Sequence, residues 1–326
     1  MSVEDALKAR IAAEGPIGVD DFMAAANAHY YATRDPLGSA GDFITAPEIH
    51  QMFGEMVGAA LADVWTRAGR PAEVAYVELG PGRGTLAADA LRVMERADLR
   101  PEVHFVETSP ALRDIQRQRH PDAEWHEELL TIPPGLSLLI VANEFFDALP
   151  VRQWVGEHKR KIALEDDRFA FTIDGPVRED SPQRSACAWE IGAQLDVRGG
   201  AAIIIDYGYA GGEQGDTLQA VREHRFADPL EAPGEQDLTA HVDFAALADA
   251  GRVGSTVPSA VVSQGTWLET LGIGARAMAL AAKNPQDTEG IAAARRRLCD
   301  EGEMGRLFKV MALTGKDWPS VAGLEP

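Results

Sequence analysis

The segment "VELGPGRGTL", residues 77–86, has a spacing that can hold a nucleoside carrying no phosphate. It follows an apolar run and places glycine at positions 80, 82 and 84, where a backbone without side chains can approach a ligand closely. The next apolar run ends at Glu107, whose carboxylate can accept hydrogen bonds from both ribose hydroxyls. The helix expected after the glycines can face a carboxylate with its N-terminus. S-adenosylmethionine meets all three conditions, and we expect it as the cofactor.

Two other nucleotide sites are disfavoured by the same segment. A P-loop needs G-x-x-x-x-G-K-[ST], and neither the lysine nor the spacing is present. A dinucleotide site needs G-x-G-x-x-G, and Thr85 stands where the third glycine would fall when counting from Gly80. A nucleotide-dependent oxidoreductase is therefore a weakened alternative. A glycine-rich turn that only packs tightly remains a structural alternative.

Glu144 and Asp147 in "NEFFDALP", residues 143–150, are the candidate acceptor-binding residues because they follow the end of an apolar run. In methyl transfer the protein mainly positions the nucleophile and removes a proton. The competing interpretation gives both residues local hydrogen bonds in a turn before Pro150. Asn143 is expected to line the cofactor or acceptor pocket.

Three further residues are expected near the cofactor. Asp42 lies in a segment that can fold over the ligand, Thr45 begins the following helix, and Thr108 follows Glu107. The alternative for residues 41–43 is a turn whose phenylalanine packs as a hydrophobic staple. Thr45-x-x-Glu48 has the spacing of a capping box, which predicts one long helix with its apolar face running to Val64.

The runs "VAYVEL", "VHFVE", "LSLLIVAN" and "AAIIIDYG" alternate with helix-like segments, which predicts an α/β fold with a Rossmann-like parallel sheet. Ligands of such sheets bind at the carboxyl ends of the strands. We expect an N-terminal helical region (1–70) covering the cofactor site and a core formed by 71–150 and 198–326. Residues 151–197 alternate like antiparallel strands before a helix, and we expect them to form an inserted β-meander and helix. "GRLFKVMAL" predicts a late strand.

Composition narrows the class of protein. The 326 residues carry a formal net charge of −20 and no apolar stretch of eighteen residues, which disfavours a nucleic-acid partner and membrane insertion. The acidic start "MSVEDALKAR" does not resemble a signal peptide, and the expected localisation is cytoplasmic. The two cysteines and His29, His224 and His241 show no metal-ligand spacing, so no metal is expected.

The chain resembles the MidA-type family in nine segments between about Tyr30 and Met311. They are "GDFITAPEIHQMFGE", "ELGPGRGTL", "FVETSPALRDIQ", "LLIVANEFFDALPVRQ", "IIIDYG", "DTLQAVREH", "DLTAHVDF", "SQGTWL" and "MGRLFKVM". The resemblance implies a class I S-adenosylmethionine-dependent methyltransferase. It places Gly80, Pro81, Gly82 and Gly84 in the cofactor loop and Glu107 on the ribose.

The mitochondrial member of that family assists assembly of respiratory complex I. The resemblance therefore implies a protein substrate, arginine as the acceptor, and a complex I subunit as the protein that carries it. A guanidinium, with a pKa of about 13.8, is a poor nucleophile and needs carboxylates that grip its fork, which Glu144 and Asp147 can supply. The alternative function is a cofactor-binding assembly factor that holds a partner protein without significant turnover.

Overall fold

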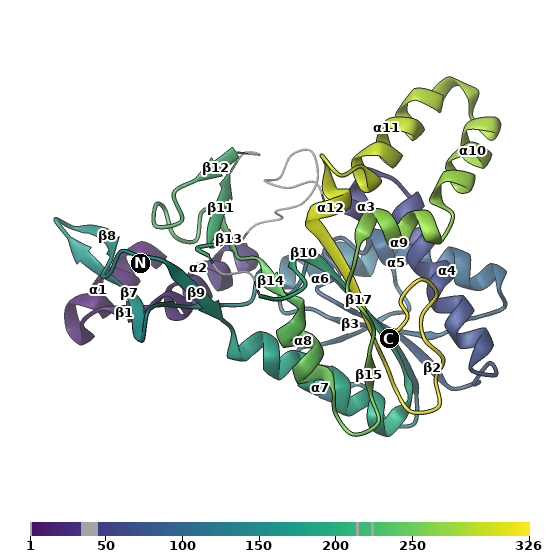
Figure 1. The fold of residues 1–326 in the computed structure, drawn as a ribbon, viewed down its shortest axis with the longest axis horizontal. Coiled ribbons are helices and arrows are strands. Elements are labelled where there is room, and N and C mark those ends of the chain that lie inside the picture. Colours follow the sequence, from purple (N-terminus) through teal and green to yellow (C-terminus); the bar gives the residue numbers. More distant parts are fainter. Residues whose placement is uncertain (1, 34–44, 213–214, 223–224) are drawn as a thin grey trace.

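A computed structural model of the chain describes residues 2–33, 45–212, 215–222 and 225–326. At its centre lies a nine-stranded sheet (Figure 1). Five strands run parallel in the order β4-β3-β2-β5-β10, and β17 lies antiparallel beside β10. Their bounds are β2 (Val74–Leu79), β3 (Glu102–Val106), β4 (Glu124–His126), β5 (Ser137–Asn143), β10 (Gly200–Tyr209) and β17 (Phe308–Thr314). Three short strands, β14 (Val242–Asp243), β15 (Val257–Pro258) and β16 (Val262–Ser263), pair with β10 or β17. The predicted α/β sheet and its late strand are confirmed.

Helices cover both faces of this sheet, which explains why its inner strands are apolar without alternation. Tyr76 of β2 packs toward α4 (Met52–Arg67) and α5 (Thr85–Arg96), whereas its neighbour Val77 packs toward the opposite face. That second face is covered by α7 (Pro182–Arg198) and α8 (Phe244–Gly251). Alternate residues of one continuous apolar strand therefore pack into two separate hydrophobic cores, one on each face of the sheet.

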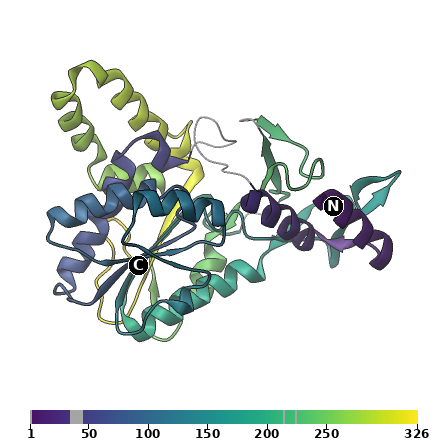
Figure 2. The ribbon, with the colours of Figure 1, turned by 180° about the vertical axis from the view of Figure 1, so that it is seen from behind.

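A second lobe lies beside the sheet (Figure 2). It contains α1 (Val3–Glu14), α2 (Val19–Thr33) and the predicted meander, β6 (Arg152–Val155), β7 (His158–Glu165), β8 (Arg168–Phe171) and β9 (Val177–Asp180). The two-residue strand β1 (Ile17–Gly18) pairs with β7, a contact that the sequence did not predict. Phe22 of α2 and Ile162 of β7 share one apolar core with Leu238. The N-terminal segment and the inserted meander therefore pack together in this lobe.

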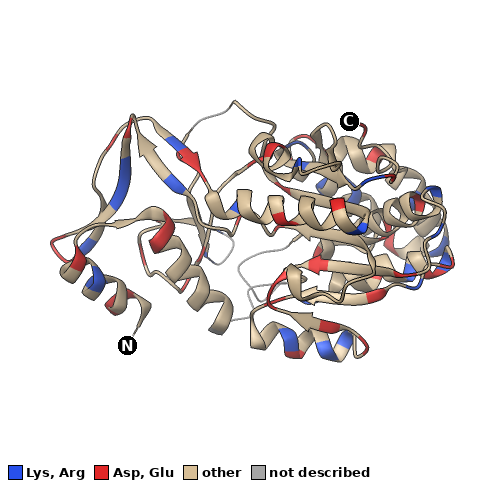
Figure 3. Ribbon diagram, turned by 90° about the horizontal axis from the view of Figure 1, so that it is seen from below, with Lys and Arg blue, Asp and Glu red and all other residues tan. Residues whose placement is uncertain are grey.

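Smaller elements complete the fold. A three-stranded sheet is formed by β11 (Gln219–Arg222), β12 (Arg225–Ala227) and β13 (Asp237–Thr239). Helices α10 (Ile273–Lys283) and α11 (Thr288–Cys299) form a hairpin that projects from the core (Figure 1). The remaining helices are α3 (Ala46–Ile49), α6 (Pro110–Arg119), η1 (Leu129–Thr131), α9 (Gln264–Thr270), η2 (Pro285–Asp287) and α12 (Met304–Leu307). Acidic and basic residues are interspersed along the ribbon (Figure 3).

The long helix predicted to begin at Thr45 is interrupted, and its predicted capping box is wrong. Thr45 makes no side-chain cap, and the Glu48 carboxylate instead accepts a hydrogen bond from Thr85 Oγ1 at 2.5 Å. The chain is extended at His50, whose Nδ1 accepts from the Met52 amide at 3.1 Å and so begins α4. Glu48 is therefore hydrogen-bonded to Thr85, a residue distant in sequence, and does not cap the helix.

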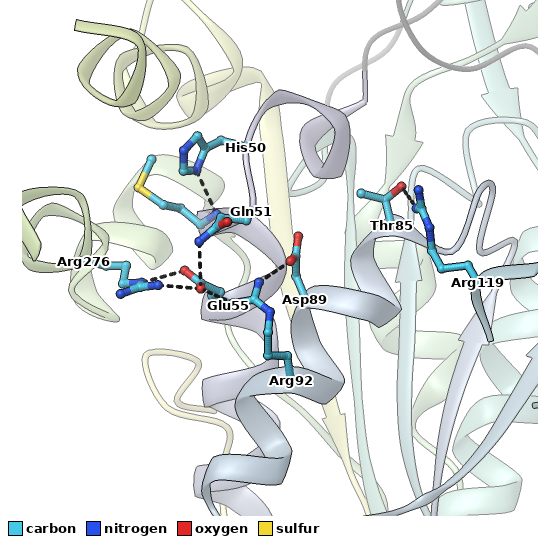
Figure 4. A network of polar contacts seen from close by, with 9 residues as sticks. His50, Gln51, Glu55, Thr85, Asp89, Arg92, Arg119 and Arg276 are labelled. Carbon is cyan, nitrogen blue, oxygen red and sulfur yellow. Dashed lines mark hydrogen bonds and ion pairs between the residues drawn. The ribbon is translucent and has the colours of Figure 1, made fainter. Parts of the chain in front are cut away.

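A buried carboxylate on α4 connects that helix to α5 and to the α10–α11 hairpin (Figure 4). Glu55, 1% exposed, accepts two hydrogen bonds from Arg276 of α10, at 2.6 and 2.7 Å, and one from Arg92 of α5 at 2.9 Å. Burial opposes ionisation of Glu55, but these two guanidinium groups lower its pKa overall. The ionised carboxylate thereby fixes the base of the hairpin.

Candidate active site

A cavity of about 530 Å³ opens at the carboxyl ends of β2, β3 and β5, against α2. The order of the strands reverses between β2 and β5, and such switch points are where ligands bind in open α/β sheets. Nine of the predicted site residues line the cavity: Thr45, Gly80, Pro81, Gly82, Glu107, Thr108, Asn143, Glu144 and Asp147. Gly84 is not among the described residues that line it, and Asp42 lies outside the described residues.

The three glycines after β2 all have positive φ, at +62° for Gly80, +54° for Gly82 and +71° for Gly84. A Cβ added to Gly80 would lie 3.0 Å from the Phe145 ring, and one added to Gly84 would lie 2.8 Å from the His120 ring. At these two positions the backbone conformation and a neighbouring protein ring already require glycine. The requirement for glycine here comes from the protein itself, whereas the spacing alone predicts that it comes from the ligand.

Glu107 is held in place by groups that leave part of its carboxylate facing the cavity. The Ser109 amide donates to Oε1 at 2.8 Å, and Gln116 Nε2 donates to Oε2 at 3.2 Å. The same Gln116 nitrogen donates to the Gly82 carbonyl at 2.7 Å, so one amide joins the glycine loop to the acid. Burial raises the pKa of Glu107. The Thr108 amide is a third donor to this carboxylate. A carboxylate accepts about four hydrogen bonds, which leaves Glu107 capacity for a ligand.

Glu144 has a strained backbone, with φ at +48°. A left-handed non-glycine residue costs about 1–2 kcal/mol, and such strain is concentrated at functional sites. Its amide donates to the Ile205 carbonyl at 2.9 Å, while its carboxylate accepts from the Ala46 amide at 3.1 Å and from Asn143 Nδ2 at 3.3 Å. Burial and the nearby Asp147 charge raise the pKa of Glu144 to about 8. The side chain therefore holds α3 and can change its charge near neutral pH.

Asp147 lies in a turn whose backbone is hydrogen-bonded to the buried carboxylate of Asp206. The amides of Phe146 and Asp147 donate to the buried Asp206 Oδ2 at 3.0 and 3.1 Å, and Arg184 donates to the Asp147 carbonyl at 2.9 Å. Tyr207 is hydrogen-bonded to the Asp147 carboxylate. Burial raises the pKa of Asp147. Asp206 and Arg184 therefore shape the turn, whereas Asp147 lines the cavity.

Two buried acceptor atoms at the cavity lack a partner within the described part of the chain. They are Asn143 Oδ1 and Asp147 Oδ1. A buried oxygen without a donor carries a desolvation penalty, which a ligand with N–H groups would remove. Both atoms belong to residues that follow or end β5. This part of the cavity is suited to a ligand rich in hydrogen-bond donors.

The charge of the cavity wall favours positive ligands. One guanidinium, that of Arg83, is found among the described lining residues. Six carboxyl groups line the same space: Glu48, Glu78, Glu107, Glu144, Asp147 and Asp237. Burial raises the pKa of Glu78 to about 8, as it does at Glu144. A sulfonium, an ammonium or a guanidinium would relieve the repulsion among these acids.

Helix α2, part of the expected N-terminal helical region, forms one wall of the cavity through residues that sequence reasoning did not single out. Asn27 Nδ2 donates to the Ala148 and Leu238 carbonyls at 3.0 and 2.7 Å, and its Oδ1 accepts from the Leu238 amide at 3.1 Å. Tyr31 Oη donates to Asp237, and the Tyr31 carbonyl accepts from Ser109 Oγ at 2.7 Å. The residues in these pairs are far apart in sequence, and no local pattern signals them.

Comparisons with known proteins agree with this geometry. A family of S-adenosyl-L-methionine-dependent methyltransferases matches residues 56–196 and 156–261. The protein arginine methyltransferase NDUFAF7 homolog, mitochondrial, of Drosophila melanogaster is 34% identical over 96% of this chain and 84% of its own length. The chain belongs to this methyltransferase family. Human NDUFAF7, with the same activity in its name, is 31% identical over 93% of this chain and 81% of its own.

The fold of this methyltransferase also matches a solved structure. A Burkholderia thailandensis protein crystallised with S-adenosyl-homocysteine superposes with a TM-score of 0.85 and 26% identity, covering 98% of this chain and 93% of that one. The predicted family, fold, enzyme class and S-adenosylmethionine cofactor are confirmed.

The cavity of this methyltransferase fits that cofactor. Glu107 retains acceptor capacity for the ribose hydroxyls, and the acidic wall suits the sulfonium and ammonium charges. Asn143 Oδ1 offers a further buried acceptor.

One expectation is wrong. The relatives are mitochondrial by name, which contradicts the predicted cytoplasmic localisation, and we withdraw that prediction. Within the described residues, every helix is too short or too polar to cross a membrane.

Proposed function

We propose that this methyltransferase methylates an arginine side chain of a protein, with Glu144 and Asp147 gripping the guanidinium. The observation that carries the proposal is the pair of carboxyl groups after β5, one of them with a buried oxygen that lacks a partner within the described residues. A guanidinium is planar and presents five N–H donors, which suits such a pair. The relatives named protein arginine methyltransferases support the same acceptor.

The carboxyl groups also suit the proton balance of the reaction. When bound, the cofactor would supply an electrophilic methyl group on a sulfonium and would leave as the neutral thioether when the sulfur–methyl bond breaks. As the acceptor nitrogen gains a bond to carbon, it must lose a proton. Glu144, with its pKa near 8, is driven toward the carboxylate by an incoming guanidinium and can then accept that proton. Asp147 holds the other edge of the fork, and the proton passes finally to water.

The cofactor side of the proposal uses the other residues that line the cavity. Glu107 binds the ribose, and Gly80, Pro81 and Gly82 contact the cofactor through the loop. Thr45, Thr108 and Asn143 complete its surroundings. Gly84 acts indirectly, because it caps α5 at the N-terminal end that the loop leads into.

The acceptor protein that the family resemblance suggests is a subunit of respiratory complex I. The NDUFAF7 relatives support a protein substrate, and we propose a complex I subunit as the first acceptor to examine. Because the cavity is acidic, we expect the methylated arginine to lie in an exposed segment with additional positive charge.

The experiment compares arginine methylation in the proteomes of host cells that carry the chain, lack it, or carry Glu144→Gln. Peptides that lose methylation in both altered strains are then offered to the purified chain with labelled S-adenosylmethionine, alongside Arg→Lys peptides. We expect label on the arginine peptides and none on the lysine peptides. Stoichiometric cofactor binding without transfer to any such peptide would support the holding assembly factor instead.

A further inference from the structure

The outer edge of the central sheet carries a cluster of two histidines and a glutamate, outside the cavity. His104 lies on β3, and Glu124 and His126 lie on β4. The strands are parallel, with His104 opposite Glu124. Since side chains two residues apart point to the same face, all three project together. One nitrogen or oxygen atom from each lies within 4.8 Å of the others.

The distances within this cluster are close to those of a metal-ligand set. His104 Nδ1 lies 3.0 Å from His126 Nε2 and 3.9 Å from Glu124 Oε2. Tetrahedral zinc, with bonds of about 2.0–2.1 Å, holds its ligand atoms about 3.3 Å apart. Small side-chain rotations therefore suffice to bring the three atoms around one ion.

The hydrogen bonds of His126 leave its Nε2 without a proton. Thr131 Oγ1 donates its single hydrogen to the Glu128 carbonyl at 2.8 Å, because a carbonyl can only accept. The same oxygen lies 2.9 Å from His126 Nδ1 and must therefore accept from it. In the neutral ring Nε2 then presents a lone pair toward His104 Nδ1.

His104 is left with an unsatisfied atom if no cation is present. Its Nδ1 must donate to His126 Nε2, and the buried Nε2 then carries a lone pair. That atom has no hydrogen-bond partner within the described residues and lies 3.6 Å from Glu102 Oε2, another acceptor. A cation reverses this arrangement, because Nδ1 becomes a ligand and Nε2 carries the proton toward Glu102. The orphaned atom thereby gains a partner.

We propose that His104, Glu124 and His126 bind one divalent transition metal ion of the zinc class, with water completing the coordination. Imidazole and carboxylate ligands with a water suit such an ion. Glu102 and Thr131 would orient the two rings, as carboxylates and hydroxyls do around metal-bound histidines. No local spacing predicts this site, because its ligands come from two strands and not from one helix.

The site lies next to the ribose-binding region. The Glu107 amide donates to the His126 carbonyl at 3.0 Å, and Arg113 donates to the same carbonyl at 3.1 Å. An ion held by both strands would fix this edge of the sheet and thereby the backbone of Glu107. Its role is therefore structural, and it takes no part in the methyl transfer.

The main competitor for the ion is a proton on His104, which would let both ring nitrogens donate. Stoichiometric metal binding distinguishes the two occupants.

The test uses the full chain without an affinity tag, stripped with a chelator. It is titrated with Zn²⁺ by calorimetry and with Co²⁺ by absorption, and its melting temperature is followed. We expect one ion per chain, a tetrahedral Co²⁺ spectrum and a higher melting temperature. Because His104 is buried, the variants are His126→Ala and Glu124→Gln, with His158→Ala on β7 as the matched control.

Each variant of the cluster should lose at least tenfold in metal affinity, while His158→Ala should bind as the parent does. If the parent binds no stoichiometric ion, or if His126→Ala binds Zn²⁺ as tightly as the parent, the proposal is wrong. A ¹⁵N spectrum that shows a doubly protonated His104 in the presence of equimolar Zn²⁺ would assign the cluster to the proton instead. None of these measurements depends on methyl transfer.

Discussion

Replacing Glu144 by glutamine separates acceptor binding from cofactor binding. The substitution keeps the shape of the side chain and an oxygen that can still accept from the Ala46 amide. It removes the negative charge that the proposed guanidinium would meet. A charge-assisted hydrogen bond made at the reacting centre is worth about 3 kcal/mol, which corresponds to roughly a hundredfold in rate. We expect methyl transfer to fall by that factor.

Cofactor affinity should change by no more than a few-fold in the same variant, since Glu107 and the glycine loop are intact. The assay pairs single-turnover transfer of labelled methyl with direct titration of S-adenosylmethionine. Glu179→Gln is a matched control, because Glu179 is a carboxyl group of raised pKa that contacts Gln153 and Thr217 and does not line the cavity. Its transfer rate should equal that of the parent.

Two results would refute this reasoning. If cofactor affinity falls in proportion to the transfer rate, Glu144 belongs to the cofactor site. If neither changes, Glu144 has the structural role of holding α3, and the guanidinium is bound elsewhere.

Three other predictions follow from the structure. Gly82 has a φ of +54°, which a branched side chain opposes, so Gly82→Val should abolish the rise in melting temperature that S-adenosyl-homocysteine gives the parent. Calorimetry that shows the variant binding this ligand as tightly as the parent would contradict the prediction. Burial gives Glu78 and Glu144 pKa values of about 8 in the folded chain, against 4.5 for a free glutamate, so the folded chain binds more protons between these pH values and should lose stability as pH rises from 4.5 to 8. Glu78→Gln should weaken this dependence of the unfolding free energy on pH in denaturant titrations, and an unchanged dependence would contradict the prediction. Arg276→Ala leaves the buried Glu55 with one guanidinium, that of Arg92, and should lower the unfolding free energy measured in urea by about 3 kcal/mol. A loss below about 1 kcal/mol would show that Arg92 and water replace the Arg276 hydrogen bonds.

The strands of the central sheet were predictable because each one is a continuous apolar run of adjacent residues. Runs such as "LSLLIVAN" and "AAIIIDYG" became β5 and β10, and burial on both faces explains their lack of alternation. The glycine spacing after β2 likewise predicted a ligand loop that lines the cavity, since the conformation of such a loop depends on adjacent residues.

The missed features depend on partners far away in the chain. Glu48 has the spacing of a capping residue but accepts from Thr85, and His50 ends the first helical segment. Gln116 connects Gly82 to Glu107 from within α6, and no spacing in the sequence predicts either contact. Asn27 closes the cavity through contacts with residues more than a hundred positions later. A single sequence gives no spacing from which such contacts follow.

A crystal structure with S-adenosyl-homocysteine and an arginine peptide would test the central claim most directly. We predict the ribose hydroxyls on Glu107 and guanidinium nitrogens at about 2.7–2.9 Å from carboxylate oxygens of Glu144 and Asp147, the range of charge-assisted pairs. A guanidinium bound away from both carboxylates, with the cofactor in the cavity, would contradict the proposed acceptor site.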